Sequence, residues 1–189
     1  MCNYLENKMK VYIKELIKDK NVGAITSTSS HAVMKLVKKI NFKNAETIIE
    51  YGPGCGVITK ILLENMKLNA SLYVFETNKN FIETLSEIND KRLFIINADA
   101  ESAEYVLKTR YQIDRVDNII STIPFTFFKM RKRKRIIFKS FKLLNENGRF
   151  ITYQYSWLIF SLMKRHFKNV NWEVELFSFP PSVLIDGIK

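Results

Sequence analysis

The chain has 189 residues, of which 47% are hydrophobic, so it can bury the core of one domain and is too apolar to be disordered. It contains 30 lysine and arginine residues against 19 aspartate and glutamate residues, which gives a net charge of +11. This excess favours a polyanionic partner, either nucleic acid or an anionic membrane surface. The alternative is that the charge only keeps the protein soluble.

The two cysteines, Cys2 and Cys55, provide no disulfide framework and no metal-binding spacing, so we expect no metal site. No stretch reaches the roughly 18 unbroken apolar residues of a membrane span. The N-terminus lacks the apolar centre and cleavage site of a signal peptide. We therefore expect a monomer in the cytoplasm, peripherally associated with the inner face of the cell membrane.

Residues 3–20 have the pattern of a basic amphipathic helix, which can lie on anionic lipid head groups. The alternative is a helix packed on the main domain with a solvated lysine face. A break at Gly23 and Ala24 follows, and it divides the chain into an N-terminal helix (1–22) and one domain (23–189). The apolar positions of the helix recur at steps of three and four residues: Leu5, Met9, Tyr12, Ile13, Leu16 and Ile17.

From Thr47 onward, short apolar strand patterns alternate with helical patterns, which predicts a parallel sheet with right-handed crossovers. We therefore expect an α/β, Rossmann-like fold: a seven-stranded, mostly parallel sheet with helices on both faces. The predicted strands are 47–50, 71–76, 93–97, 116–121, 149–155, 170–177 and 183–188. The predicted helices are 31–40, 57–66, 78–88, 102–111, 130–144 and 157–167, with a turn at 145–148.

A glycine loop follows the first of these strands. Gly52, Gly54 and Gly56 alternate with Pro53 and Cys55, so the backbone can turn sharply and no bulky side chain blocks a ligand. The helix after the loop begins with free N–H groups that point back at it. Strand, glycine turn and helix form the first unit of a nucleotide-binding sheet, although a simple tight turn is the alternative.

Two acidic residues stand at the ends of the next strands. Glu76 ends the second strand about 20 residues after Gly56, where nucleotide-binding sheets place an acid on the ribose. Asp99, followed by Ala100, comes after the third strand and can accept from an adenine amino group. The alternative for Glu76 is a solvent-facing strand end. Because parallel strands end at one sheet edge, the loop and both acids are expected to line one ligand crevice.

The loop has the spacing G-x-G-x-G and not the G-x-G-x-x-G of dinucleotide sites. Glu50 would repel a pyrophosphate but suits a ligand with a sulfonium and an ammonium group. The segment Glu50 to Gly56 resembles motif I of the class I S-adenosylmethionine-dependent methyltransferases. The resemblance implies S-adenosylmethionine as cofactor, with Glu76 on the ribose and Asp99 on the adenine. The expected cofactor-binding residues are Glu50, Gly52, Gly54, Gly56, Glu76, Asp99, Ala100 and Ser121.

The fourth strand ends at Ser121 and continues into Thr122, Ile123, Pro124 and Phe125, beside the expected sulfonium. Methyl transfer requires an unprotonated nucleophile held in line with the methyl group. We expect Ser121, Pro124 and Phe125 to do the holding, with Pro124 stiffening the turn and Phe125 offering a ring face to a cation. Core packing is the alternative for the phenylalanines.

Two related subfamilies end this strand similarly. The ribosomal RNA adenine dimethyltransferases place an asparagine, which holds the base amino group, where this chain has Thr122. The bacterial phospholipid N-methyltransferases, which methylate phosphatidylethanolamine, resemble the chain more closely. The shared features are the segments from Gly23 to Ser29 and from Ser121 to Pro124, Tyr155 after the fifth strand, and the turn at Phe179-Pro180-Pro181.

This resemblance implies an N-methyltransferase acting on the amine of a membrane phospholipid, and RNA is the alternative substrate. A lipid amine with a pKa near ~10 must lose a proton before it attacks. Tyr155 or Tyr153 can accept that proton or orient the nitrogen, and we favour Tyr155 as catalytic. The basic run 129–135 can hold lipid phosphates or an RNA backbone, or be a solvated helix face. A binding protein without turnover is a third possibility.

Overall fold

The computed structural model describes residues 30–175 and 182–189 of the chain. The predicted N-terminal amphipathic helix at 3–20 and the turn at Pro180 and Pro181 lie outside these ranges. No helix in the described part of the chain is long and apolar enough to cross a membrane.

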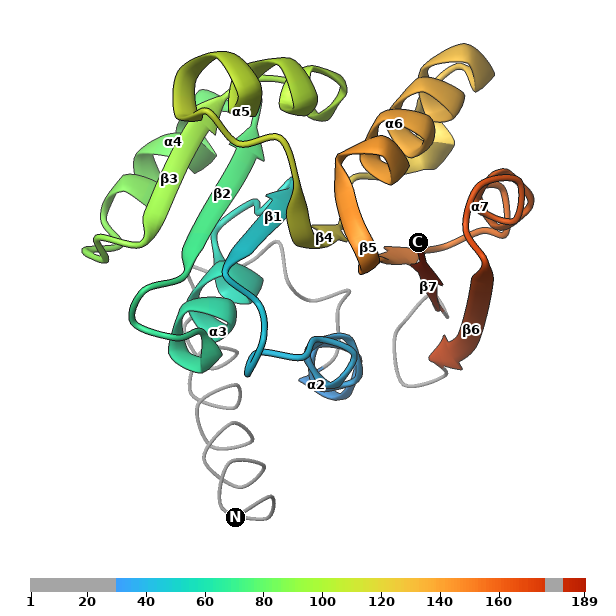
Figure 1. The fold of residues 1–189 in the computed structure, drawn as a ribbon, viewed down its shortest axis with the longest axis horizontal. Helices are drawn as coiled ribbons and strands as arrows, with labels where there is room; N and C mark the ends of the chain where they lie inside the picture. The colour runs from blue at the N-terminus through green and yellow to red at the C-terminus, as the bar shows by residue number, and fades with distance from the viewer. Residues whose placement is uncertain (1–29, 176–181) are drawn as a thin grey trace.

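The described strands form one seven-stranded sheet in the order β3-β2-β1-β4-β5-β7-β6 (Figure 1). Strands β3, β2, β1, β4 and β5 are parallel to one another, whereas β7 is antiparallel to both β5 and β6. The predicted seven-stranded, mostly parallel sheet is therefore confirmed. The strands are β1 (Thr47–Tyr51), β2 (Ser71–Glu76), β3 (Leu93–Asn97), β4 (Val116–Ser121), β5 (Leu144–Gln154), β6 (Asn169–Glu175) and β7 (Ser182–Ile188).

Helices cover both faces of the sheet, because successive strand residues point to opposite sides. Ile48 of β1 belongs to one apolar cluster and Ile49 to the other. Helices α2, α3 and α4 contribute to the first cluster, and α5, α6 and α7 to the second; in Figure 1, α2 and α3 lie below the strands and α5 and α6 above them. The helices are α2 (Ser30–Lys38), α3 (Val57–Asn65), α4 (Lys79–Ser86), α5 (Ala103–Tyr111), α6 (Met130–Leu143) and α7 (Phe160–Met163), with 3-10 turns η1 (Ala100–Ser102) and η2 (Phe125–Phe127).

Two predicted elements differ from the structure. The turn expected at 145–148 lies within β5, which begins at Leu144 because this residue pairs with Val116 of β4. The extra residues are accommodated by a register shift between Val116 and Asn118 and by a positive φ of 64° at Asn147. The helix expected at 157–167 is reduced to the four residues of α7, flanked by turns with three- and four-residue hydrogen bonds.

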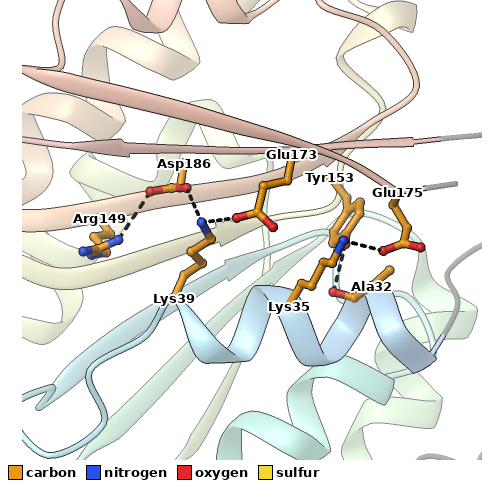
Figure 2. A network of polar contacts seen from close by, with 8 residues as sticks. All are labelled: Ala32, Lys35, Lys39, Arg149, Tyr153, Glu173, Glu175 and Asp186. Carbon is orange, nitrogen blue, oxygen red and sulfur yellow. Dashed lines mark hydrogen bonds and ion pairs between the residues drawn. The ribbon is translucent and has the colours of Figure 1, made fainter.

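Ion pairs and a hydrogen bond connect α2, and Lys39 directly after it, to strands β5, β6 and β7 (Figure 2). The Lys35 Nζ lies 3.2 Å from Glu175 Oε2. The Lys39 Nζ lies 2.5 Å from Glu173 Oε1 and 3.1 Å from Asp186 Oδ1. The side chains of Glu175 and Asp186 are each only 1% exposed. Buried carboxylates need cationic partners, so these lysines fix where α2 lies on β6 and β7.

We predict that Lys39→Met lowers the free energy of unfolding by about 1–3 kcal/mol, because it leaves the buried Asp186 with fewer cationic partners. Asp186 retains Arg149, whose Nη1 atom is 3.3 Å from Asp186 Oδ2, and this ion pair limits the loss. Urea unfolding measures the change, with the exposed Lys43→Met as the matched control. Equal effects of the two substitutions would contradict a specific role for the Lys39 ion pairs.

Candidate active site

The glycine loop between β1 and α3 has the left-handed backbone that its residues predict. Gly52 has φ +70°, and a Cβ there would lie 2.7 Å from Ile123 Cγ2, which follows β4. Gly54 has φ +56°, and a Cβ there would meet no atom within 4 Å. Gly52 therefore permits close packing of two loops, and Gly54 faces open space in which a ligand can approach the backbone.

Glu76 at the end of β2 is almost completely buried and fastens this loop. Its Oε2 accepts a hydrogen bond from Gly54 N at 3.2 Å, and its Oε1 accepts from Thr77 N and Asn78 N at 2.8 and 2.9 Å. The carboxylate also lines a cavity at the sheet edge. The position fits the ribose-binding role predicted from the sequence, which stays a prediction.

This first cavity, which we call the nucleoside cavity, also contains the predicted adenine partner Asp99. Asp99 Oδ1 accepts from Glu101 N at 2.9 Å, and Oδ2 lies 2.5 Å from Lys132 Nζ. The ammonium of Lys132 lies 4.4 Å from the ring centroid of Phe128. The cavity is lined by Gly52, Phe75, Glu76, Thr77, Ala98, Asp99, Ala100, Ile123, Phe128 and Lys132. Phe128 follows η2, and the sequence predicts it, with Phe127, as an apolar wall beside this loop, with core packing as the alternative. The sequence did not reveal Lys132, because α6 reaches the cavity only through the fold.

Glu50 of β1 is fully buried, and its carboxyl has one satisfied oxygen. Thr59 Oγ1 donates to Oε2 at 2.6 Å, whereas Oε1 has no hydrogen-bond partner in the described part of the chain. Burial, with a smaller contribution from the charge of Glu76, raises the pKa of Glu50 from 4.5 to about 8. Glu50 is in the described lining of neither cavity, so its predicted role in cofactor binding stays a prediction. A cationic ligand bound close to this carboxyl would favour its ionised form.

The segment after β4 is tied to the glycine loop and to β5. Thr122 Oγ1 donates to Gly52 O at 2.6 Å, and Thr122 N donates to Tyr51 O at 3.0 Å. Gln154 Nε2 donates to Ile123 O at 3.0 Å, while its Oε1 accepts from Phe125 N at 3.3 Å. Gln154 is a positioning residue that the sequence did not reveal, because its position next to this loop depends on the pairing of β4 with β5.

The structure does not bring all predicted residues of this segment to a cavity. Ser121 is fully buried, and its Oγ has no hydrogen-bond partner among residues 30–175 and 182–189. The ring of Phe125 is buried against Phe128, with centroids 6.0 Å apart. Neither residue is in the described lining of the two cavities, whereas Pro124 is. The Phe125 geometry matches the alternative of core packing, because the ring is 1% exposed and belongs to an apolar cluster of the core.

A second cavity lies on the other side of the glycine loop, and we call it the acceptor cavity. Tyr153 and Tyr155 both line it, but their hydroxyls differ. Tyr153 donates to Ala32 O of α2 at 2.9 Å (Figure 2), and burial raises its pKa further above the ordinary value. Tyr155 is 49% exposed, and its hydroxyl has no partner within the described residues. The cavity is lined by Val33, Gly52, Pro53, Gly54, Cys55, Val57, Ile58, Phe81, Thr122, Pro124, Tyr153, Gln154, Tyr155 and Ser182.

Of the two tyrosines, only Tyr155 has a hydroxyl without a partner among the described residues, and its catalytic role stays a prediction. The described residues contain no group of three histidine, cysteine, aspartate or glutamate side chains that could hold a metal ion. The arrangement therefore offers a carboxylate-rich cavity beside an apolar, aromatic one, joined at Gly52.

Structural comparison identifies the fold. The N-methyltransferase NodS from Bradyrhizobium japonicum, in complex with S-adenosyl-L-homocysteine, matches with a TM-score of 0.72 over 97% of this chain and 98% of NodS. At a sequence identity of 12%, this structural match shows a shared fold. This fold and the match of residues 24–168 to a methyltransferase family, given next, define a class I methyltransferase, and S-adenosylmethionine is its cofactor.

Sequence comparison gives the family. The profile of the ribosomal RNA adenine dimethylase family matches residues 24–168, and the chain belongs to this family. It is 25% identical over 166 residues to the ornithine lipid N-methyltransferase of Singulisphaera acidiphila, covering 85% of each chain. It is 30% identical over 142 residues to the ribosomal RNA small subunit methyltransferase A of Malacoplasma penetrans, covering 74% of this chain and 48% of that relative.

The raised pKa of Glu50 predicts that the unliganded protein loses stability as the pH rises. The folded state keeps a proton that the unfolded state releases near pH 4.5, so this contribution is fully present below pH 4.5 and is lost as the pH rises through about 8. The slope from this group is at most about 1.4 kcal/mol per pH unit. Urea unfolding between pH 5.5 and 8.5 should show a component that Glu50→Gln removes. Identical pH dependence in both proteins would contradict the assignment.

For the nucleoside cavity, we predict that Asp99→Ala weakens S-adenosylhomocysteine binding about tenfold, the value of one lost hydrogen bond to a charged group. Lys132→Met removes the ion pair but leaves the carboxylate, so its affinity should change by less than about threefold. Isothermal titration calorimetry measures both variants. If Lys132→Met weakens binding as much as Asp99→Ala does, Asp99 acts through the ion pair and not through adenine.

Proposed function

We propose that this protein transfers a methyl group from S-adenosylmethionine to the amine of a membrane phospholipid such as phosphatidylethanolamine. The observation that carries the proposal is the acceptor cavity, whose lining is mainly apolar and aromatic and which contains the free hydroxyl of Tyr155. The ornithine lipid N-methyltransferase, which aligns over 85% of both chains, supports a lipid as the substrate that is methylated on nitrogen.

The Thr122 geometry also supports a lipid amine over a nucleic acid base. The asparagine that occupies this position in the RNA-modifying subfamily offers a carboxamide oxygen to the base amino group. Thr122 has no such oxygen, and its hydroxyl hydrogen is already donated to Gly52 O at 2.6 Å. The amide that would hold a base is therefore absent, and the hydroxyl serves the glycine loop.

In the proposed reaction, the cofactor supplies an electrophilic methyl group on its sulfonium sulfur. The lipid ammonium first loses a proton, because its pKa near ~10 keeps it protonated at neutral pH. Tyr155 accepts or relays this proton, or orients the nitrogen lone pair. Pro124 and the glycine loop form the walls that hold the amine beside the methyl group. As the N–C bond forms, the S–C bond breaks and S-adenosylhomocysteine leaves.

The basic run at 129–135 has two kinds of side chain. Lys132, Arg133 and Arg135 are bonded to the protein itself, at Asp99, Thr126 O and Glu101 respectively. The remaining cations, Lys129, Arg131 and Lys134, are exposed and have no such partner in the described structure. These three can meet lipid phosphates, and together with the expected N-terminal helix (1–22) they would recruit a monomer to the inner face of the cell membrane.

Methylation of RNA is the second candidate, favoured by the family match and by the 30% identical ribosomal RNA methyltransferase. The exposed cations of α6 suit a phosphate backbone as well as a lipid surface. The chain spans about half the length of that relative. The absence of the asparagine at Thr122 disfavours this candidate.

Incubation with radiolabelled S-adenosylmethionine, in parallel with phosphatidylethanolamine vesicles and with ribosomal RNA, tests the proposal. We expect label in the lipid fraction and a kcat at least about tenfold lower for Tyr155→Phe. The exposed Tyr105→Phe on α5 is the matched control and should retain full activity.

Label in RNA alone would favour the second candidate. Binding of S-adenosylhomocysteine without label in either fraction would indicate a protein that keeps the fold without turnover. Full activity of Tyr155→Phe on lipid would leave the substrate assignment intact and remove Tyr155 from catalysis.

A further inference from the structure

Large apolar side chains are exposed in two neighbouring segments, after β5 and along β6. Tyr155, Trp157, Leu158, Trp172 and Val174 are each between 39% and 50% exposed. We call these five residues the tryptophan patch. Clusters of exposed large apolar side chains are unusual on soluble proteins and mark interaction sites.

The two segments of the patch touch each other. The rings of Trp157 and Trp172 are 4.6 Å apart between centroids, at an interplanar angle of 83°. Trp172 and Val174 are two residues apart on β6, so they share one face of that strand. Glu173 between them points the other way and pairs with Lys39, which follows α2. Strand β6 is at the end of the sheet, so the patch lies on an outer edge of the described fold.

The patch begins at the acceptor cavity. Tyr155 belongs both to the patch and to the cavity lining, and Trp157 follows two residues later. A surface that docked onto this patch would therefore stand at the cavity's opening. Its occupant must have a chemistry that is compatible with the acceptor that the cavity receives.

The surroundings of the patch are cationic. No aspartate or glutamate occurs between Tyr155 and Asn171, whereas Lys164 and Arg165 are exposed. Lys168 is also exposed but lies 3.4 Å from Glu146 Oε2, and the charge of Glu173 on β6 is paired with Lys39. Lys164 Nζ lies 5.2 Å from the ring centroid of Phe160, which packs on Trp157 at 6.0 Å. Tryptophan and tyrosine prefer the boundary between lipid and water, where the ring is in an apolar layer and its polar atom meets the head groups. Lysine and arginine beside them complement anionic lipid.

We propose that the tryptophan patch inserts into the head-group region of an anionic lipid bilayer and so presents the acceptor cavity to amines held in that bilayer. The inference rests on the proposed lipid substrate and names the surface by which that substrate is reached. A lipid amine then enters beside Tyr155 while its acyl chains stay in the membrane, so no whole lipid has to be extracted into water.

The chain offers a direct reporter, because Trp157 and Trp172 are its only two tryptophans. The full-length protein is titrated with vesicles of phosphatidylglycerol and phosphatidylcholine, which contain no amine substrate. We expect a blue shift of the tryptophan emission, and quenching by lipids brominated near the head of the acyl chain. Vesicles of phosphatidylcholine alone should produce a much smaller shift. Sedimentation with anionic vesicles without any shift or quenching would show that another face docks and would overturn the proposal.

Substitutions distinguish vesicle binding by the tryptophan patch from non-specific adsorption of any exposed apolar side chain. Trp172→Ser should weaken vesicle binding about tenfold, the value of one large apolar side chain removed from the lipid layer. Leu68→Ser, which changes another exposed apolar residue far from the patch in the sequence, is the matched control and should bind as the unchanged protein does. Calorimetric binding of S-adenosylhomocysteine verifies that both variants are folded. Equal vesicle affinity of Trp172→Ser and the unchanged protein would overturn the proposal.

Two further outcomes are decisive. A second copy of the chain on the β6 edge would give a dimer in sedimentation, with emission that is already blue-shifted without vesicles, and this would overturn membrane docking.

The vesicle experiment requires no turnover, so it stands even if phosphatidylethanolamine is not methylated. If lipid is the substrate, Trp172→Ser should raise KM for vesicle substrate and leave the rate on a detergent-dispersed short-chain aminolipid unchanged. A loss of both rates would mean that Trp172 acts in the cavity and not in docking.

Discussion

The carboxylate of Glu76 fixes the glycine loop at the edge of the sheet. It accepts hydrogen bonds from Gly54 N, Thr77 N and Asn78 N, so the end of β2, the glycine loop and the start of α4 have fixed positions relative to one another. Thr122 adds a bond to Gly52 O from the end of β4. The backbone of the loop is thus held open by neighbouring strand ends before any ligand arrives, which lowers the ordering cost of binding.

Much of the fold was predictable because its signals are local. The strands 71–76 and 93–97 have the predicted bounds, since each contains an uninterrupted apolar run next to polar residues. The strand 116–121 also has its predicted bounds, although Asp117 and Asn118 interrupt its apolar pattern. The turn predicted at 145–148 was wrong. Its Asn and Gly residues indicate a turn locally, but Asn147 N donates to Lys189 O and Lys189 N donates to Gly148 O at the end of the chain. Tertiary pairing decided the conformation of this segment.

In the candidate site, too, the residues with local sequence signals were predictable and those placed by tertiary structure were not. The glycine loop, Glu76 and Asp99 were predictable because each stands at the end of a recognisable strand, and all three line the described cavities. The depth of Ser121 and Phe125 was not predictable, because it depends on how β4 is placed between β1 and β5. Gln154 and Lys132 come from distant elements and do not belong to a sequence pattern that marks a cofactor site.

The nucleoside cavity and the acceptor cavity have Gly52 as their shared residue in the described lining. Substitutions on α2 or after β5 can therefore reshape the acceptor side while the carboxylates of the other side keep their positions. Under the proposed function, the half that holds the methyl donor can be inherited intact while the half that receives the methyl acceptor diverges. This separation accounts in physical terms for a family whose relatives include both an ornithine lipid N-methyltransferase and ribosomal RNA methyltransferases.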